Sequence, residues 1–151
     1  MRYSIVTYTP SEPLPEAQLL PLAKWLHHHL GEYRDPLPDI LACLKYALGT
    51  QGQQGGSILI AEDAAGKPLG ALVLNDTHMS GYVPAHLLVY IAVDERHRGQ
   101  GIGHTLLETA LRTATGGIAL HVEPDNPARK LYEALGFTHK YIEMRYVHPA
   151  R

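Results

Sequence analysis

A glycine-rich turn that follows a basic segment is the part of the chain best suited to hold an anion. The segment Asp94–Arg98 carries two arginines and a histidine, which would add positive charge, and three glycines follow at alternate positions. The first N–H groups of a helix have no partners inside it, and glycine lets a phosphate approach the bare backbone. We therefore expect a pyrophosphate to bind consecutive backbone amides here. They belong to Arg98, Gly99, Gln100, Gly101, Ile102, Gly103 and His104.

The spacing of these glycines separates three kinds of phosphate site. A P-loop needs Gly-Lys followed by Ser or Thr, but Gly103 is followed by His104 and Thr105, which excludes it. A dinucleotide-binding turn needs G-x-G-x-x-G, whereas this chain has G-x-G-x-G. Glu123 lies about twenty residues further on, where that turn has an acid, and we interpret this as a coincidence. The third pattern, Arg/Gln-x-x-Gly-x-Gly/Ala, fits the run from Arg98 to Gly103.

This third pattern resembles the acetyl-CoA pyrophosphate motif of the GNAT superfamily, the Gcn5-related N-acetyltransferases. A second motif of that family follows at the usual distance, in the run NPARKLYEALGF from Asn126 to Phe137. The close match extends from Leu87 to Phe137, and the N-terminal half is similar to the family only in the order of its elements. The resemblance implies an enzyme that uses acetyl-CoA as co-substrate. It would transfer the acetyl group directly, in a ternary complex, to a primary amine of a small molecule or peptide.

The resemblance also implies a fold. We expect a single α/β domain over residues 1–151, with a mixed, twisted sheet of about six to seven strands and helices on both faces. In this family the fourth and fifth strands splay apart where the acyl donor enters, and here they correspond to Leu87–Val93 and Ile118–Glu123. The pantetheine arm would hydrogen-bond the unpaired backbone of Ile91, Ala92 and Val93, since buried amides without partners are costly.

Acetyl transfer to an amine needs donors that stabilise the oxyanion and an acid that protonates the departing thiolate. By resemblance, Tyr132 is the acid, and Asn126 caps the short helix and contacts the pantetheine region. A backbone N–H of the fourth strand, that of Val93 or Ala92, would receive the thioester carbonyl. The structural alternatives are that Tyr132 packs its helix onto the sheet and that Asn126 is a plain N-cap.

The reaction also needs a base, because an ammonium has no lone pair and an amine of pKa near 10 is mostly charged at pH 7. Some family members carry a glutamate five residues before the motif asparagine, and His121 occupies that position here. Glu123 is two residues further on and would share one face of a strand with His121. The alternatives that stay open are His121, Glu123 and a water molecule.

The remaining elements follow from hydrophobic periodicity and from the glycines and prolines that interrupt it. The loop Asp76–Ala85 either lies on the surface or borders the acceptor site. Phe137–Val147 is expected to give one or two final strands. The other expected elements are a strand at Arg2–Thr9, helices at Glu16–Leu30 and Leu37–Leu48, a hairpin of Ser57–Asp63 and Pro68–Asn75, and a short helix that ends at Gly136.

Two further features are expected to have no part in the chemistry. His27, His28 and His29 are consecutive, and consecutive helix residues point about 100° apart, so we interpret them as solvated residues near a helix C-terminus and expect no metal. Cys43 falls inside the second helix with no neighbour apart from Lys45 to lower the pKa of its thiol, so it is expected to be buried and unreactive.

Composition excludes several classes of protein. The net charge is −2 with no basic block, which argues against nucleic-acid binding, and no apolar run is long enough to span a membrane. A single cysteine suits a cytoplasmic location. Two alternatives to an acetyltransferase remain: a domain that binds acetyl-CoA as a sensor without turnover, and a dinucleotide-dependent oxidoreductase, which the glycine spacing disfavours. A homodimer through the last strands is also possible.

Overall fold

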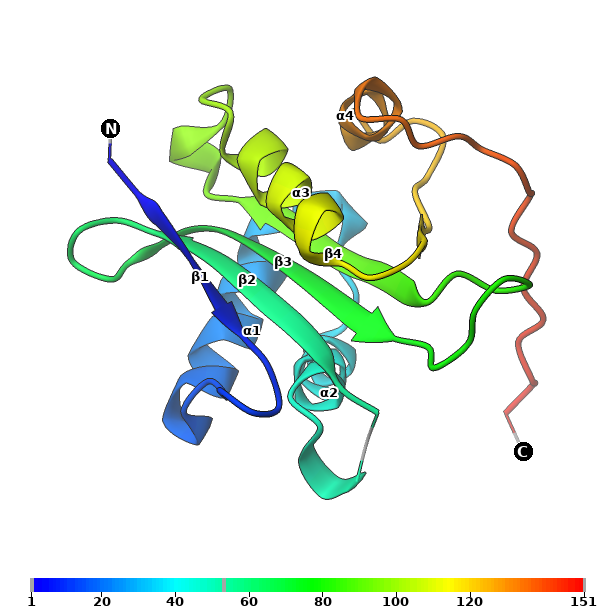
Figure 1. Ribbon diagram of the computed structural model, residues 1–151, viewed down its shortest axis with the longest axis horizontal. Helices are drawn as coiled ribbons and strands as arrows, with labels where there is room; N and C mark the ends of the chain where they lie inside the picture. Colours follow the sequence, from blue (N-terminus) through cyan, green and yellow to red (C-terminus); the bar gives the residue numbers. More distant parts are fainter. Residues whose placement is uncertain (1, 53, 151) are drawn as a thin grey trace. The chain divides into compact units, whose positions relative to one another are not determined.

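The computed structural model describes residues 2–52 and 54–150. The chain divides into two compact units, Met1–Leu120 and His121–Arg151. The first unit contains one sheet in the order β1-β2-β3-β4-β5 (Figure 1). The pairs β1–β2, β2–β3 and β3–β4 are antiparallel, whereas β5 runs parallel to β4. The strands are β1 (Ser4–Tyr8), β2 (Gly56–Glu62), β3 (Pro68–Asp76), β4 (His86–Val93) and β5 (Ile118–Leu120).

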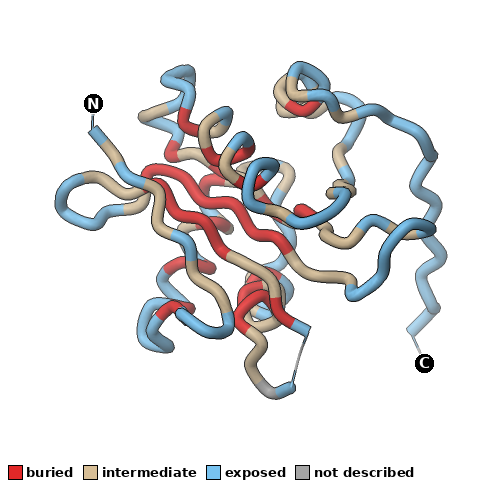
Figure 2. Tube along the Cα trace, viewed as in Figure 1, coloured by how far each residue is buried: buried red, intermediate tan, exposed pale blue. Residues whose placement is uncertain are grey.

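Helices cover both faces of this sheet, as the sequence predicts (Figure 1). On one face, α1 (Leu19–His29) and α2 (Leu37–Ala47) pack against strand residues such as Ile58, Ala71 and Val73 in one apolar cluster. On the other face lies α3 (Ile102–Thr113), whose Leu106 and Leu107 are fully buried. Burial is deepest along β2 and β3, which lie between the two layers (Figure 2). Short 3-10 helices lie at Glu16–Gln18, Gly31–Tyr33, Thr50–Gly52 and Glu95–His97.

Gly70 on β3 permits the close approach of α3. A Cβ at this position would lie 2.8 Å from Cγ2 of Ile102 and 3.0 Å from a methyl group of Leu106. The helix that carries the glycine-rich turn at its N-terminus is therefore fixed to the sheet by direct packing on the glycine backbone.

A β-bulge interrupts β4 where it pairs with β3. Val73 pairs with Tyr90 but the next residue, Leu74, pairs with Leu88, so Val89 is the extra residue. A bulge shifts the alternation of backbone groups by one residue, which changes the groups that face each edge of the strand.

The parallel pairing of β4 with β5 is short. It involves His86, Leu87 and Leu88 of β4 and ends at Leu120, three residues earlier than the strand predicted to run to Glu123. Beyond Leu88, the edge of β4 that faces β5 has no strand partner among the described residues. This agrees with the prediction that the two strands separate.

The second unit contains one helix, α4 (Ala128–Ala134), and no strand among its described residues. The final strands predicted at Phe137–Val147 are therefore absent, and the sheet has five strands instead of the expected six to seven. Tyr141, Ile142, Tyr146 and Val147 have high β-propensity, yet all of them, like Met144, are exposed. A strand exists only where its backbone pairs with another, and this segment has no such partner. No described helix combines the length and apolar character that crossing a bilayer requires.

Replacement of Gly70 by Ala is expected to destabilise the first unit. The new methyl group would overlap Ile102, whose branched side chain has little freedom to move. Urea denaturation should show a loss of about 1–3 kcal/mol in the free energy of unfolding. Gly117→Ala is the matched control, since its Cβ would meet Pro84 at an ordinary 3.5 Å. Equal stability of the two variants would contradict this account of the packing.

Candidate functional site

The loop between β4 and α3 presents a row of free backbone amides. Gly99 and Gly101 both have positive φ angles, 78° and 82°, which are conformations that favour glycine. The amide of Thr105 donates to the carbonyl of Gly101 at 3.0 Å, in the first hydrogen bond of α3. The seven amides from Arg98 to His104 donate to no acceptor in the described part of the chain. These are the amides that the sequence predicts to bind pyrophosphate, and the positive end of the α3 dipole lies among them.

Asp94 holds the start of this loop. Its carboxylate is buried and accepts hydrogen bonds from the Arg96 amide at 2.9 Å and from the Arg96 guanidinium at 3.2 and 3.3 Å. The hydrogen bonds from Arg96 hold the pKa of the Asp94 carboxyl well below its usual range. His97 approaches the same carboxylate, with 3.7 Å between Nδ1 and Oδ1. The Arg96 guanidinium is thereby paired with Asp94 inside the loop.

Arg98 and His29 attach the loop to its surroundings. The guanidinium of Arg98 donates to the carbonyl of Val93 at 3.3 Å and to that of His29, at the end of α1, at 2.8 Å. Nδ1 of His29 accepts the amide hydrogen of Glu95 at 3.3 Å. His29 is itself buried, and this burial lowers the pKa of its imidazole, so the ring stays neutral near pH 7. The loop is therefore connected both to β4 and to α1.

The open edge of β4 can be assigned from its hydrogen bonds. The amide of Asp94 donates to the carbonyl of Leu69 on β3 at 2.8 Å, so Asp94 faces β3. Backbone groups alternate along an antiparallel strand, so Ala92 also faces β3 while Ile91 and Val93 face the open edge. Of the three residues predicted to bind pantetheine, Ile91 and Val93 therefore present backbone groups there. The backbone groups of Ala92 instead face β3, where Ala92 pairs with Ala71.

The structure describes the candidate catalytic residues within the second unit. The side-chain carbonyl of Asn126 accepts the amide hydrogen of Ala128 at 2.9 Å, so Asn126 does cap the start of α4. Tyr132 on α4 is buried, with its ring 5.8 Å from that of Phe137. Its hydroxyl has no hydrogen-bond partner among the described residues, and burial raises the pKa of Tyr132 to about 12.

His121 and Glu123 are not arranged as the sequence predicts. Both residues are exposed and follow the end of β5, so they do not share a face of a strand. The amide of Asn126 donates to the carbonyl of Glu123 at 3.0 Å, so a turn follows Glu123 directly. Pro124 supports this turn because a proline cannot continue a central strand.

Sequence reasoning missed the residues that shape the loop. Asp94 has a recognisable signal, because an aspartate directly after a strand is a common cap for the turn that follows. His29 has none, since its contact with Glu95 joins residues far apart in the chain. The same holds for the phenol of Tyr90, which donates to Asp35 at 2.6 Å. Cys43 is half-buried rather than buried, but its expected lack of reactivity agrees with the structure, where desolvation raises the pKa of its thiol to about 12.

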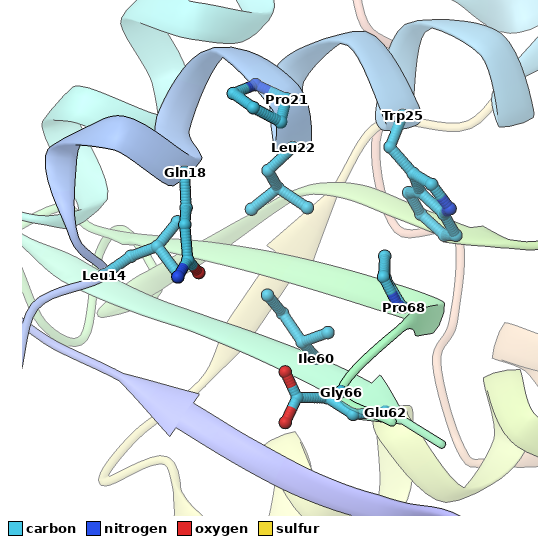
Figure 3. A pocket seen from close by; sticks show the side chains of 9 residues that line it. All are labelled: Leu14, Gln18, Pro21, Leu22, Trp25, Ile60, Glu62, Gly66 and Pro68. Atoms are coloured by element: carbon cyan, nitrogen blue, oxygen red, sulfur yellow. The ribbon is translucent and has the colours of Figure 1, made fainter. Parts of the chain in front are cut away.

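A separate cavity of about 290 Å³ lies between α1 and the β2–β3 hairpin. Leu22 and Trp25 on α1 face Ile60 on β2 across it (Figure 3). None of the predicted site residues lines this cavity, so the candidate site remains the loop and the open edge of β4. The cavity is lined by Leu14, Gln18, Pro21, Leu22, Trp25, Ile60, Glu62, Gly66 and Pro68.

Comparison with known proteins agrees with this geometry. The family model of the acetyltransferase (GNAT) domain matches residues 54–139, more than half of the chain. N-alpha-acetyltransferase 40 of Saccharomyces cerevisiae is 42% identical over 78 residues, which cover 44% of this chain and 27% of that protein. Mycothiol acetyltransferase of Catenulispora acidiphila is 33% identical over 78 residues, covering 48% of this chain and 25% of that protein. The chain thus spans about a quarter of the length of the curated relatives it matches.

Solved structures show the same fold over the full chain. An aminoglycoside N-acetyltransferase in complex with CoA superposes with a TM-score of 0.67, covering 99% of this chain and 98% of that one at 18% identity. At this identity the likeness concerns the fold alone. The family match, the fold and the glycine-rich loop lead to one conclusion: this chain belongs to the GNAT family of acetyltransferases.

Proposed function

We propose that the protein is an acetyl-CoA-dependent N-acetyltransferase that transfers the acetyl group directly to a primary amine of a small molecule or peptide. The observation that carries this proposal is the row of free amides from Arg98 to His104 beside the open edge of β4, in a member of the GNAT family. Backbone donors at a helix N-terminus suit a diphosphate, and an unpaired strand edge suits the amides of a pantetheine arm.

The donor site lies in the first unit. The amides of Arg98 to His104 would bind the pyrophosphate, and Ile91 and Val93 would hydrogen-bond the pantetheine arm. The amide of Val93 is also the better placed of the two predicted donors to the thioester carbonyl, because the amide of Ala92 faces β3. A donor at that position would stabilise the oxyanion that forms when the amine attacks.

Tyr132 is proposed to assist the departing thiolate. With a pKa of about 12, the phenol stays protonated throughout the neutral range. A simple thiol has a pKa near 8.5, so full transfer of the phenol proton would be uphill by about 5 kcal/mol. The phenol would therefore act mainly by donating a hydrogen bond to the sulfur. The hydroxyl supports this role because it is not among the fully buried polar atoms of the described residues and so can reach a ligand.

The base is proposed to be His121, with Glu123 and water as alternatives. Both side chains are exposed, so neither is committed to the packing of the second unit. A neutral imidazole is available over much of the physiological pH range, which suits proton removal from an ammonium.

The class of acceptor is inferred from the family and from the names of two relatives. The names of two relatives, N-alpha-acetyltransferase 40 and mycothiol acetyltransferase, both describe acetyl transfer. The proposed acceptor is a primary amine of a small molecule or peptide. The single cysteine suits a cytoplasmic location. The homodimer stays a prediction.

The proposal is tested by thiol release from acetyl-CoA with a panel of small amines and N-terminal peptides, alongside calorimetric titration with acetyl-CoA. Saturable binding together with amine-dependent thiol release supports an acetyltransferase. Binding without release on any amine would instead favour a sensor, and tighter binding of NAD than of acetyl-CoA would favour the oxidoreductase.

Gly101→Val should weaken the binding of acetyl-CoA by about tenfold or more, because a branched side chain would cover the free amides. Calorimetric titration measures the change. Gly66→Val is the matched control, since Gly66 has a φ of 80° and equally open surroundings but lies in the β2–β3 turn. Equal affinities of both variants would remove the loop from the binding site.

Tyr132→Phe should lower kcat by about 10- to 100-fold while the affinity for acetyl-CoA stays within about twofold, because only the hydrogen bond to the leaving sulfur is lost. Tyr141→Phe makes the same chemical change on an exposed residue of the same unit and should leave kcat unchanged. An unaltered kcat in Tyr132→Phe would exclude the phenol from the reaction.

His121→Ala should flatten the rise of kcat/KM between about pH 6 and 8, the range in which an imidazole ordinarily becomes a base. His139→Ala, at another exposed histidine of the second unit, should keep the wild-type profile. If His121→Ala also keeps that profile, Glu123→Gln distinguishes the carboxylate from water.

A further inference from the structure

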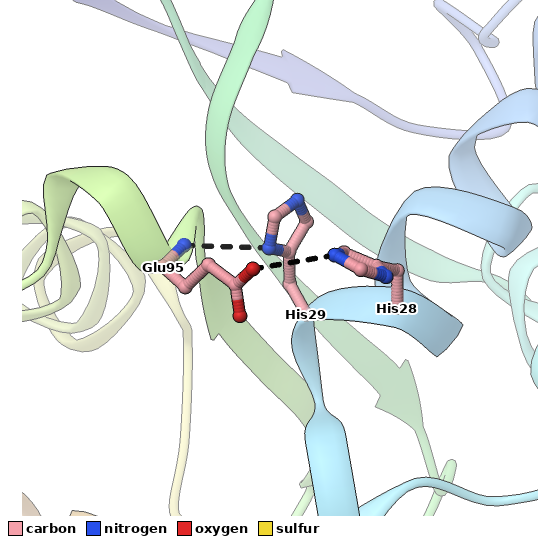
Figure 4. A group of neighbouring side chains, drawn as sticks. All are labelled: His28, His29 and Glu95. Carbon is pink, nitrogen blue, oxygen red and sulfur yellow. Dashed lines mark hydrogen bonds and ion pairs between the residues drawn. The ribbon is translucent and has the colours of Figure 1, made fainter.

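The three histidines at the end of α1 are not arranged as the sequence predicts. Consecutive helix residues were expected to diverge, yet the rings of His28 and His29 lie edge to face with 4.7 Å between their centroids. Glu95, the first residue of the 3-10 helix in the loop, reaches both of them (Figure 4). One ligand atom from each of these three residues lies within 4.8 Å of the other two. His27 is outside this group.

The distances in the cluster are close to those of a metal site. Bonds of about 2.0–2.1 Å in a tetrahedral zinc site place neighbouring ligand atoms about 3.4 Å apart. Nε2 of His28 and Oε1 of Glu95 are already 3.5 Å apart. The side chains of His28 and Glu95 are 64% and 58% exposed, so both can rotate to close the remaining distance to His29.

His29 is prepared to act as the fixed ligand. Its ring packs against Trp25, with 4.6 Å between the centroids, and Nδ1 is the ring nitrogen that faces Glu95 (Figure 4). Because Nδ1 accepts the Glu95 amide hydrogen at 3.3 Å, its lone pair points into the cluster and the ring proton is on Nε2. Nε2 lies 3.8 Å from Oδ2 of the buried Asp94. A carboxylate behind the outer nitrogen of a histidine is the usual support for a metal-bound imidazole.

Two features oppose metal binding, and both are weak. A metal on Nδ1 would displace the Glu95 amide, but that hydrogen bond is at the long end of the range. The guanidinium of Arg98 lies on the carbonyl of His29 and repels a cation, while Arg96 is neutralised by Asp94. With two neutral imidazoles and one carboxylate, the ligand set suits a first-row transition ion such as Zn²⁺ rather than Mg²⁺ or Ca²⁺, which prefer oxygen.

We propose that His28 Nε2, His29 Nδ1 and Glu95 bind a divalent transition-metal ion of the zinc class, with water completing its coordination. The ion would connect the last turn of α1 to the first residue of the loop that carries the free amides. It would act as a structural cross-link, because no proposed catalytic residue belongs to the cluster.

The test measures metal binding directly and does not depend on acetyl transfer. Protein freed of metal with EDTA and dialysed is titrated with Zn²⁺ by calorimetry and with Co²⁺ by visible absorption. The wild type should bind one equivalent, with the intense Co²⁺ bands of a tetrahedral site. His28→Ala and Glu95→Ala should each weaken the affinity at least tenfold. Both side chains are exposed, so both variants should fold.

His27→Ala is the matched control, because it removes a histidine from the same turn of α1 that lies outside the cluster. It should retain wild-type affinity. Equal affinity of the wild type and His28→Ala, or the absence of saturable binding to the wild type, would overturn the proposal. A loss of affinity in His27→Ala as large as that in His28→Ala would also overturn it, since the histidines would then act only as a non-specific cluster.

Discussion

The structure depends on backbone N–H groups that the fold itself leaves without partners. A backbone amide without a protein acceptor must donate to water or to a ligand, since leaving it buried and unsatisfied would cost about 1–3 kcal/mol. Here two sets occur side by side in the chain: the edge-facing amides of Ile91 and Val93, and the amides from Arg98 to His104. A fold that maintains both sets is stable only if water satisfies them or a ligand replaces that water. The short β5, the bulge and the glycine turn therefore have one effect in common, which is to leave backbone amides available to a ligand.

The two arginines of the loop are paired with groups of the protein itself. Arg96 binds the buried Asp94, and Arg98 binds two carbonyl groups, so both guanidinium groups are occupied by the protein. The potential offered to a phosphate therefore comes mainly from oriented amides and the α3 dipole. The arginines act as braces that keep the loop in one conformation. A fixed set of donors loses little entropy when a ligand binds, which favours affinity.

The sequence predicted those features that are set by neighbouring residues. The strand Leu87–Val93, the turn and the helix after it are recognisable because alternation, glycines and helical spacing occur within one short stretch. The bulge at Val89 is not, because it depends on the register with β3, and it decides whether Ala92 or Val93 presents its amide to the open edge. The predicted strands at Phe137–Val147 failed for a related reason, since β-propensity does not supply a pairing partner.

Long-range contacts explain the remaining differences. His29 and Asp94 are separated by most of the first unit in sequence, and their approach follows from the packing of α1 on the sheet. The interpretation of His28 and His29 as diverging side chains relied on ideal helix geometry. At the last turn of α1 the rings instead face a loop residue, and the loop rather than the helix brings them together.

The proposed functions of binding and proton transfer belong to different units of the chain. The groups assigned to the coenzyme's pyrophosphate and pantetheine lie before Leu120, whereas Tyr132, His121 and Glu123 lie after it. Substitutions that share no partners usually have additive effects. Changes at the amides of Arg98 to His104 should therefore act mainly on coenzyme affinity, and changes at Tyr132 mainly on turnover, because the two sets are proposed to contact different parts of the coenzyme. A double variant of Gly101→Val and Tyr132→Phe whose effects are strongly non-additive would show that pyrophosphate binding and the hydrogen bond to the sulfur are energetically coupled.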